Sequence, residues 1–441
     1  MQRRHFLMAG SAGLVTALPG CGGGSEADAR MQALSDRSSS TSTGGTALAA
    51  ATATAPKVVV IGGGMAGTSV AKYLRLWGGN IDVTLVDRSS VYTSNIMSSL
   101  VLTGQRTLSS LQYKYDTLRT KYGVKTEFDE VAAIDPVTPS VRLRSGKVLP
   151  ADRIVLAPGI EFDDMPGLTD PLAMPHAWQA GTQTSTLAAQ LSAMAPGGTV
   201  VMTIPKVPYR CPPGPYERAC LVADWLKARK PGSKLLVLDA NPDFVTERDN
   251  FSNAFYGLHG KVIEYHNNVE ISSVDQASKT LYTNLGPISG KVVNLIRRQR
   301  AGGLIAATGL ANATEGRFAA VDVLSYASTV APKVHVIGDA SATTQPKAGH
   351  IANQEAKVCA DAIVRLFAGG QPDPAPVTNS ACYSTITMSQ ASWLTAVFQY
   401  DSVNHVMVPV AAAGGASPGW NGDHFNQMGT WFKALMADTF A

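Results

Sequence analysis

The sequence contains few cysteines and no strong excess of positive or negative charge, and it lacks any haem-attachment motif. Only 5 of its 441 residues are cysteine, which excludes a dense disulfide framework. Its 37 Lys and Arg nearly balance its 33 Asp and Glu, giving a formal net charge of +4 without a prominent basic run. This balance excludes the electrostatic footprint of a nucleic-acid-binding protein. No C-x-x-C-H occurs, so no c-type haem is attached to this chain, and no metal site is predicted.

The first residues have the pattern of a targeting segment. Arg3 and Arg4 precede an apolar run that is too short for a membrane span of roughly 20 residues. We predict a twin-arginine export signal over residues 1–21, and therefore a periplasmic protein. The stretch LPGC ending at Cys21 resembles a lipoprotein cleavage box, and lipid on Cys21 would be the only link to a membrane. The alternative is ordinary cleavage near the alanine-rich stretch, without lipid.

A dinucleotide-binding pattern follows. KVVVIGGGMAGTSVAKYL predicts a buried strand, a turn with Gly62, Gly64 and Gly67, and then a helix. These glycines permit a tight turn, a close approach of the backbone to a pyrophosphate, and close packing of helix on strand. Free N–H groups at the helix N-terminus favour the phosphate charge. A second strand ends at Asp87, where a carboxylate can accept a hydrogen bond from a ribose hydroxyl.

Two further strands indicate that the dinucleotide is FAD. RIVLAPG, residues 153–159, is typical of the strand that closes a flavin-binding half. Much later, VHVIGDA places Gly338 and Asp339 at the end of another buried strand. This is the second fingerprint of flavoproteins with two dinucleotide folds, in which the acid holds the ribityl chain.

The central part of the chain lacks a second glycine-rich loop. Its strand GTVVMTI is followed by PKVPYRCPPGPYE, and proline removes the N–H donors that would bind phosphate. We therefore do not expect NAD(P)H to be the electron donor. The segment that replaces the loop carries Cys211, which we expect to face the flavin.

Four cysteines remain once Cys21 is set aside, and they allow three complete pairings. Cys220 and Cys359 lie in apolar, helix-like contexts, where a free cysteine acts as a small hydrophobe. Cys211 and Cys382 lie in sequence that we interpret as turns. Two interpretations stay open, a redox-active disulfide beside the flavin and a purely structural one.

Several strings together resemble the flavoprotein subunit of flavocytochrome c sulfide dehydrogenase. They are YRCPPGPYERA, the GGGMAG turn, PHAWQAG, VHVIGDA, QPKAGHIANQEAKV and ACYS, and the similarity runs from about residue 56 onward. The resemblance implies an α/β fold of the glutathione-reductase-like FAD/NAD(P)-binding superfamily. That fold has two Rossmann-like dinucleotide-binding domains and a C-terminal α+β interface domain.

The resemblance also implies residue roles. Cys211 and Cys382 would form a redox-active disulfide above the flavin, and Glu217 would take a proton from H₂S. Trp431 would lie near the flavin, and a c-type cytochrome subunit would accept the electrons. From sequence alone, Glu217 is equally compatible with an exposed carboxylate in the first turn of a helix, and Trp431 with a core aromatic.

Three departures from the family pattern change these expectations. Ser94 stands where the family has a cysteine bonded to the flavin, so we expect non-covalent FAD, because a hydroxyl is a far weaker nucleophile than a thiolate. His350 replaces an active-site tyrosine. Arg297 and Arg298 replace prolines beside the isoalloxazine, where they would raise the flavin potential or dock an acidic partner, unless they are surface residues.

The predicted organisation follows from these motifs. We predict a signal at 1–21, a disordered linker at 22–55, an FAD-binding domain at 56–165 and 302–371, a central domain without a nucleotide site at 166–301, and an interface domain at 372–441. The leading hypothesis is an exported sulfide dehydrogenase. The alternatives are a sulfide:quinone oxidoreductase and a non-catalytic, activating flavoprotein of a periplasmic sulfur-oxidation assembly.

Overall fold

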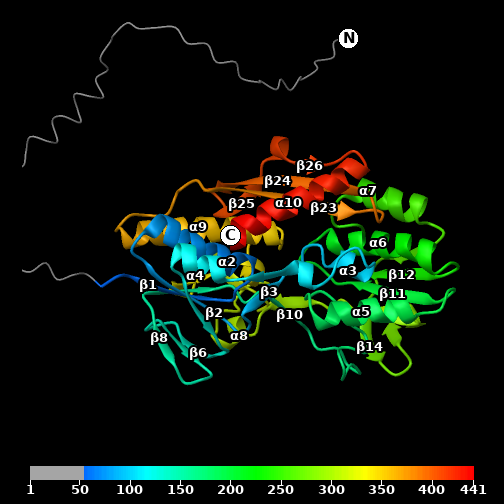
Figure 1. The fold of residues 1–441 in the computed structure, drawn as a ribbon, viewed down its shortest axis with the longest axis horizontal. Coiled ribbons are helices and arrows are strands. Elements are labelled where there is room, and N and C mark those ends of the chain that lie inside the picture. The colour runs from blue at the N-terminus through cyan, green and yellow to red at the C-terminus, as the bar shows by residue number, and fades with distance from the viewer. Residues whose placement is uncertain (1–53) are drawn as a thin grey trace, which may run out of the picture. The chain divides into compact units, whose positions relative to one another are not determined.

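The computed structural model describes residues 54–441, and its largest element is an eight-stranded sheet (Figure 1). Two separate parts of the chain build this sheet, and its centre is parallel. In spatial order its strands are β22 (Ser341–Ala342), β19 (Ala319–Asp322), β20 (Ala327–Ser328), β21 (Ala331–Val336), β9 (Arg153–Leu156), β1 (Lys57–Ile61), β2 (Asp82–Asp87) and β5 (Lys125–Phe128). The predicted signal and linker lie outside the described residues, apart from residues 54 and 55 of the linker.

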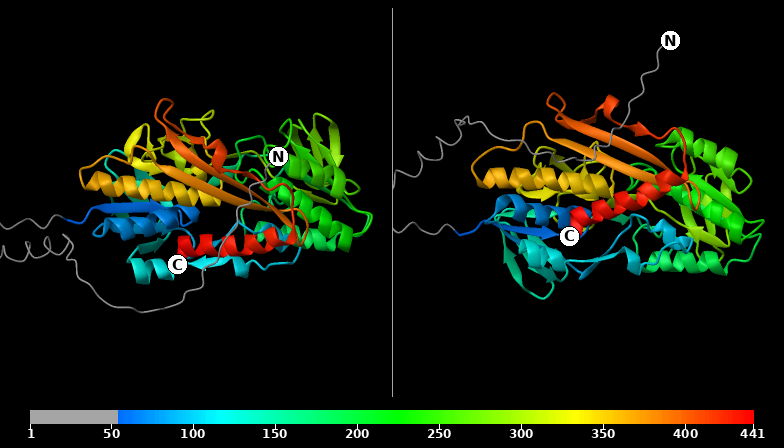
Figure 2. Two further views of the ribbon diagram at one scale, coloured as in Figure 1. Left: turned by 90° about the horizontal axis from the view of Figure 1, so that it is seen from above. Right: turned by 45° about the horizontal axis from the view of Figure 1, so that its top comes forward.

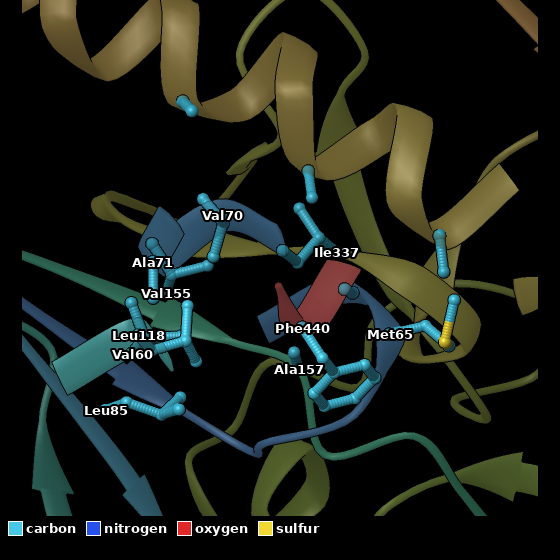
Figure 3. Close-up of a cluster of buried hydrophobic side chains, with 14 of the residues drawn as sticks. Val60, Met65, Val70, Ala71, Leu85, Leu118, Val155, Ala157, Ile337 and Phe440 are labelled. Atoms are coloured by element: carbon cyan, nitrogen blue, oxygen red, sulfur yellow. The ribbon is translucent and has the colours of Figure 1, made fainter. Parts of the chain in front are cut away.

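Both faces of this sheet are covered, which explains the continuous apolar run of β1. Val58 and Val60 face one hydrophobic cluster, while Val59 and Ile61 face another, because successive side chains of a strand point to opposite faces. On the first face lie α2 (Met65–Gly78), α4 (Asp116–Tyr122) and α9 (Gly349–Phe367). Figure 3 shows side chains of this cluster, with Phe440 from the C-terminal helix reaching into it.

The second face packs against a small antiparallel sheet and short connecting elements. These are β6 (Val131–Asp135), β7 (Ser140–Leu143), β8 (Val148–Pro150) and α8 (Leu304–Ala307). Other short elements are β3 (Val91–Thr93), β4 (Gln112–Lys114), α3 (Ser99–Leu102), the 3₁₀ turns η1 (Ser109–Leu111) and η3 (Gly338–Ala340), and the connecting pair β10 (Ile160–Phe162) and β18 (Gln299–Ala301).

The central part of the chain forms a four-stranded parallel sheet. Its strands are β13 (Ile263–His266), β12 (Lys234–Asp239), β11 (Thr199–Ile204) and β17 (Val292–Asn294). Around it lie α5 (Thr182–Ala193), α6 (Gly214–Arg229), α7 (Arg248–Ser252), the π-helix η2 (Asn253–Leu258) and an antiparallel sheet of β14 (Ile271–Asp275), β15 (Thr280–Thr283) and β16 (Gly286–Ser289).

The C-terminal part is an antiparallel sheet with one long helix. It consists of β23 (Val377–Thr385), β24 (Ala391–Asp401), β25 (Val406–Pro409), the 3₁₀ turn η4 (Ala411–Ala413), β26 (Gly415–Ala416) and α10 (Gly422–Phe440). Figure 2 shows α10 running from the central part to α2, against which it packs. The predicted α/β fold class is confirmed by this arrangement of two parallel sheets and a C-terminal sheet.

One local expectation was wrong, because Cys382 lies in a strand and not in a turn. VTNSACYST is rich in Ser, Thr and Asn, which suggested a turn. All nine residues instead pair with β24, which satisfies their backbone groups from outside the segment. Cys220 and Cys359 lie fully buried in α6 and α9, as predicted. Within residues 54–441, no helix combines the length and apolar character of a membrane span.

Lys72 of α2 holds the end of α10, and this contact yields a stability prediction. Its ammonium donates to the carbonyl oxygens of Asp438 at 2.8 Å and Ala441 at 2.6 Å. In Lys72→Met these carbonyls lose a charged donor, so we expect a loss of about 1–3 kcal/mol and faster hydrogen exchange in α10. The exposed Lys114→Met is the control. Equal thermal stability of the two variants would contradict this role.

Candidate functional site

A cavity of about 740 Å³ joins all three parts of the structure. The glycine-rich turn lines one end of it, and both Cys211 and Cys382 line it as well. Its walls therefore come from the large sheet, from the segment before α6, from β23 and from α10. A mostly pre-formed cavity of this size that collects polar groups from several elements is typical of a cofactor site.

The turn before α2 is shaped for a phosphate. Gly62 has φ +101°, and a Cβ there would meet the carbonyl oxygen of Ala157 at 2.3 Å. A Cβ on Gly67 would lie 1.8 Å from the carbonyl oxygen of Gly62, so helix and strand approach as only glycine permits. No side chain caps the N-terminus of α2, which leaves its N–H groups free for an anion. Asp87 fixes the turn by accepting the Gly63 N–H at 2.6 Å.

The second fingerprint presents polar atoms without partners. Asp339 lies 3.8 Å from Arg210, and both residues line the cavity. The Oδ1 of Asp339 and the Nη2 of Arg210 are buried and make no hydrogen bond with any group in residues 54–441. Burial raises the pKa of Asp339, although Arg210 and Lys347 oppose that shift. Buried polar atoms without partners are rare, so these two fit the hydroxyl-rich ribityl chain of FAD.

Cys211 is held by its backbone in the left-handed region, with φ +60°. Its N–H donates to the carbonyl oxygen of Lys347 at 2.6 Å, and its own carbonyl accepts the Gly214 N–H at 2.9 Å. Trp178 Nε1 donates to the Arg210 carbonyl at 3.1 Å, which fixes the preceding residue. Such a backbone conformation costs energy in a residue with a Cβ and persists only where surrounding contacts enforce it.

No disulfide joins Cys211, Cys220, Cys359 and Cys382 to one another among residues 54–441. Burial raises the pKa of the Cys211 thiol, and the nearby Cys382 and Glu217 raise it further. Burial likewise raises the pKa of Cys382 to about 12. Both thiols are therefore neutral at physiological pH, because a thiolate in this cavity loses its hydration.

Glu217 in the first turn of α6 faces the cavity, not the solvent. It accepts a hydrogen bond from Thr385 Oγ1 at 3.0 Å. Burial raises its pKa to about 7, against the opposing effects of Thr385 and Arg218. A carboxyl with a pKa close to the working pH is suited to accept and release protons.

Arg218, the next residue, is a buried cation that forms no ion pair within residues 54–441. Only 2% of it is exposed, and its guanidinium lies 4.5 Å from the centre of the Trp178 ring. Its donors meet neutral acceptors, namely Ser99 Oγ, the carbonyl oxygens of His176 and Ala177, and Asn294 Oδ1. It lines the cavity, so it supplies positive potential there.

His350 and Trp431 lie together on another wall of the cavity, with ring centres 6.3 Å apart. The Nδ1 of His350 lies 3.0 Å from the Ala381 nitrogen, which donates to it, and 3.4 Å from the Ala381 carbonyl oxygen. Burial lowers the pKa of His350, so the neutral ring is favoured. The indole Nε1 of Trp431 is buried and has no hydrogen-bond partner in the described part of the chain, so this donor is available to a bound group.

Most of the predicted site residues line this cavity. They are Gly62, Gly64, Asp87, Cys211, Glu217, Gly338, Asp339, His350, Cys382 and Trp431. Gly67 does not line the cavity; it lies where α2 packs against the Gly62 carbonyl after β1. Ser94 is buried and does not line the cavity, and its hydroxyl donates to the Ile96 carbonyl oxygen at 3.2 Å.

Arg297 and Arg298 do not line the cavity, which corrects their predicted place beside the flavin ring. Arg297 donates to the carbonyl oxygen of Asp163 and lies over the Phe162 ring. Arg298 pairs with the exposed Glu315 at 2.9 Å. For Arg298 the alternative prediction, a surface residue, is the one that agrees with the structure.

Sequence reasoning missed Arg210, Arg218 and Trp178 as parts of the site. The two arginines flank the predicted Cys211 and Glu217 in the chain, and this adjacency was the only signal. Nothing in the local pattern distinguishes them from surface cations. Their role depends on burial, which comes from distant segments.

Comparison with known families identifies three regions of the chain. Residues 184–297 match the central part of the sulfide dehydrogenase (flavocytochrome c) flavoprotein chain. Residues 374–440 match the flavin-binding region of flavocytochrome c sulphide dehydrogenase. Residues 56–194 match the pyridine nucleotide-disulphide oxidoreductases.

Several solved structures with a similar fold are oxidoreductases by name. The chain is similar to the sulfide:quinone oxidoreductase from the hyperthermophilic bacterium Aquifex aeolicus, with 17% identity, a TM-score of 0.72, and 87% of this chain and 91% of that chain covered. It is also similar to an NAD-dependent persulfide reductase from A. fulgidus, with 16% identity, a TM-score of 0.58, and 87% and 77% covered. A ferredoxin reductase from Rhodopseudomonas palustris gives 17% identity, a TM-score of 0.61, and 78% and 88% covered. At these identities the likeness concerns the fold.

The glycine turn gives a prediction about cofactor retention. Gly67→Ala places a methyl group against the Gly62 carbonyl, so α2 must move away from β1 and the phosphate site opens. We expect the purified variant to hold less than a tenth of the wild-type flavin, measured by absorbance after denaturation. Gly429→Ala is the matched control, because a Cβ at this helical position meets no atom within 4 Å. Full flavin content in Gly67→Ala would contradict the assignment.

Proposed function

Because the chain belongs to the family of flavocytochrome c sulfide dehydrogenase flavoprotein chains, we propose that it oxidises sulfide and passes the electrons through FAD to a c-type cytochrome. One observation carries this proposal. Two cysteines that are 171 positions apart in the chain line the same cavity as both flavin fingerprints and a carboxyl with a pKa of about 7.

In the proposed reaction, Cys211 and Cys382 are joined as a disulfide in the resting protein. Hydrosulfide attacks one sulfur, the S–S bond breaks, and the products are a persulfide on one cysteine and a thiolate on the other. The outer sulfur of the persulfide then bonds to the thiolate sulfur. This step forms a trisulfide and releases two electrons and one proton. Bound FAD supplies the two-electron acceptor for this step. The burial that disfavours thiolates in this cavity also favours the uncharged disulfide at rest.

The chain's own residues divide the remaining work. Glu217 accepts the proton when H₂S becomes the attacking hydrosulfide. Arg218 and Arg210 provide the positive potential that an anionic nucleophile and a leaving thiolate need in a buried site. The prolines around Cys211 hold its sulfur in place, so little conformational entropy is lost in each turnover.

The finer parts of the proposal rest on the sequence. The chain has no C-x-x-C-H, so the haem that receives the electrons belongs to a separate cytochrome subunit. FAD is bound without a covalent link, because Ser94 replaces the family's cysteine and its hydroxyl is engaged by Ile96. We also propose twin-arginine export to the periplasm, with or without lipid on Cys21. The signal and Cys21 both lie outside the described residues.

A sulfide:quinone oxidoreductase is the second candidate, and one observation favours it. The fold matches the Aquifex aeolicus sulfide:quinone oxidoreductase over 87% of this chain. Reduction of a soluble cytochrome c, compared with reduction of a soluble quinone analogue under the same sulfide concentration, distinguishes the two.

Anaerobic titration with sulfide tests the disulfide mechanism. We expect sulfide to bleach the flavin absorbance of the wild-type protein within seconds. In Cys211→Ser the flavin should stay bound and oxidised with sulfide but still be reduced by dithionite, because only the sulfur path is lost. Cys220→Ala, altered at a buried cysteine outside the cavity, is the control and should behave as wild type. Bleaching of Cys211→Ser at the wild-type rate would exclude this path.

The pKa of Glu217 predicts a pH profile. Below about pH 7 its carboxyl is protonated and cannot accept a proton, so kcat/KM should rise as the pH increases through 7. Glu217→Gln should lower kcat/KM by about 10²- to 10⁴-fold and remove this limb. H₂S ionises in the same range, so any limb left in Glu217→Gln reports the substrate. An unchanged profile and rate would exclude Glu217 as the base.

A further inference from the structure

Glu247 is a buried carboxyl near Cys382 that the proposed reaction does not use. Only 7% of Glu247 is exposed, and both of its carboxylate oxygens lie 3.3 Å from Ser392 Oγ. No basic side chain in residues 54–441 forms an ion pair with it. Its backbone has φ +46°, a strained conformation for a residue other than glycine. A buried, unpaired and strained acid is costly, and such groups concentrate at functional sites.

The register of the C-terminal sheet places this carboxyl beside Cys382. Ser392 on β24 pairs directly with Ser384 on β23, so their side chains share one face of the sheet. Cys382 is two residues before Ser384 and therefore points to the same face, roughly 7 Å along the strand. The carboxylate held by Ser392 thus lies on the face that carries the sulfur of Cys382.

Ser384 lies next to the Glu247 carboxylate. It is fully buried, and its hydroxyl lowers the pKa of Glu247, although no hydrogen bond of normal geometry joins the two groups within residues 54–441. Ser384 and Ser392 therefore both stabilise the charged carboxylate on the face that carries the sulfur of Cys382.

The charged groups around Glu247 are few. Glu217 and Cys220 face it from α6, and Cys382 faces it from β23. Asp224 and Lys227 lie further along α6 and act on Cys220. Burial raises the pKa of Glu247 to about 7, and its charge is the largest one that raises the pKa of Cys382.

We propose that Glu247 is a positioning residue whose charge sets the protonation of the sulfur on Cys382. While the carboxylate is charged, the proton stays on sulfur; when the carboxylate is neutral, that proton leaves more readily to water. No electrons are transferred, and at most one of the two groups carries a negative charge. The role of this coupling in turnover rests on the proposed function, since the trisulfide step releases a proton from sulfur.

The effect of the Glu247 charge on Cys382 can be measured without sulfide. Reduced protein with FAD bound is treated with iodoacetamide, and alkylation of Cys382 is followed by mass spectrometry from pH 6 to 9. In wild type, ionisation of Glu247 near pH 7 suppresses the thiolate on Cys382. The rate in Glu247→Gln divided by the wild-type rate should therefore be near 1 at pH 6 and rise to about tenfold at pH 9, which corresponds to one pKa unit.

Three variants make this test specific. Glu264→Gln, an exposed acid on β13, should give a ratio of 1 throughout. Glu247→Asp keeps a titrating group and should stay within twofold of wild type. Ser392→Ala removes the hydrogen bond that stabilises the Glu247 carboxylate, so the inflection in the wild-type profile should move to higher pH. Ser392→Ala also tests the proposal if Glu247→Gln does not fold. A ratio for Glu247→Gln that is independent of pH, or no inflection shift in Ser392→Ala, would overturn the proposal.

Stopped-flow reduction of the flavin by sulfide tests the proposed function separately. If wild-type flavin is not reduced at all, the proposed function fails, while the alkylation result still decides the link between Glu247 and Cys382.

Discussion

The position of Cys211 depends on one backbone hydrogen bond, from its N–H to the carbonyl oxygen of Lys347. This bond joins the segment before α6 to the segment between the second flavin fingerprint and α9, two regions that are 136 positions apart. It also holds Cys211 in a left-handed conformation that the residue would not adopt unaided. The sulfur is thereby placed relative to the fingerprint that holds the cofactor, and not merely relative to its own sheet.

Desolvation is the dominant electrostatic effect in the cavity that this contact closes. It is the largest cause of the raised pKa values of both thiols, of Glu217 and of Asp339, although Arg210 and Arg218 oppose several of these shifts. Burial therefore shifts these groups toward their neutral forms, in a cavity that two guanidinium groups also line. One anion at a time, whether hydrosulfide, thiolate or carboxylate, is stabilised there more than two.

The local motifs could be predicted because they depend on short-range rules. The strand, glycine turn and helix around Gly64, and the strand before Asp339, follow from apolar runs and from the φ and space that glycine provides. Cys382 was misplaced because its strand is stabilised by β24 and not by its own composition. Glu247 and Arg218 could not be recognised, since only tertiary contacts make them buried. The roles given to His350 and Trp431 came from the family resemblance, and the structure places both in the cavity wall.

The central sheet explains why a nucleotide-binding scaffold can serve sulfur chemistry instead. Its parallel strands β11 and β12 and its helix α6 keep the geometry in which a helix N-terminus points into the site. Proline has removed the backbone donors that a pyrophosphate requires, but the dipole of α6 remains directed at its first residues. Cys211 and Glu217 now occupy that end. Because burial outweighs the dipole, the reduced Cys211 thiol stays protonated, while Glu217, with a pKa of about 7, can gain and release a proton near neutral pH. Proton transfer and sulfur attack therefore take place at the same helix end.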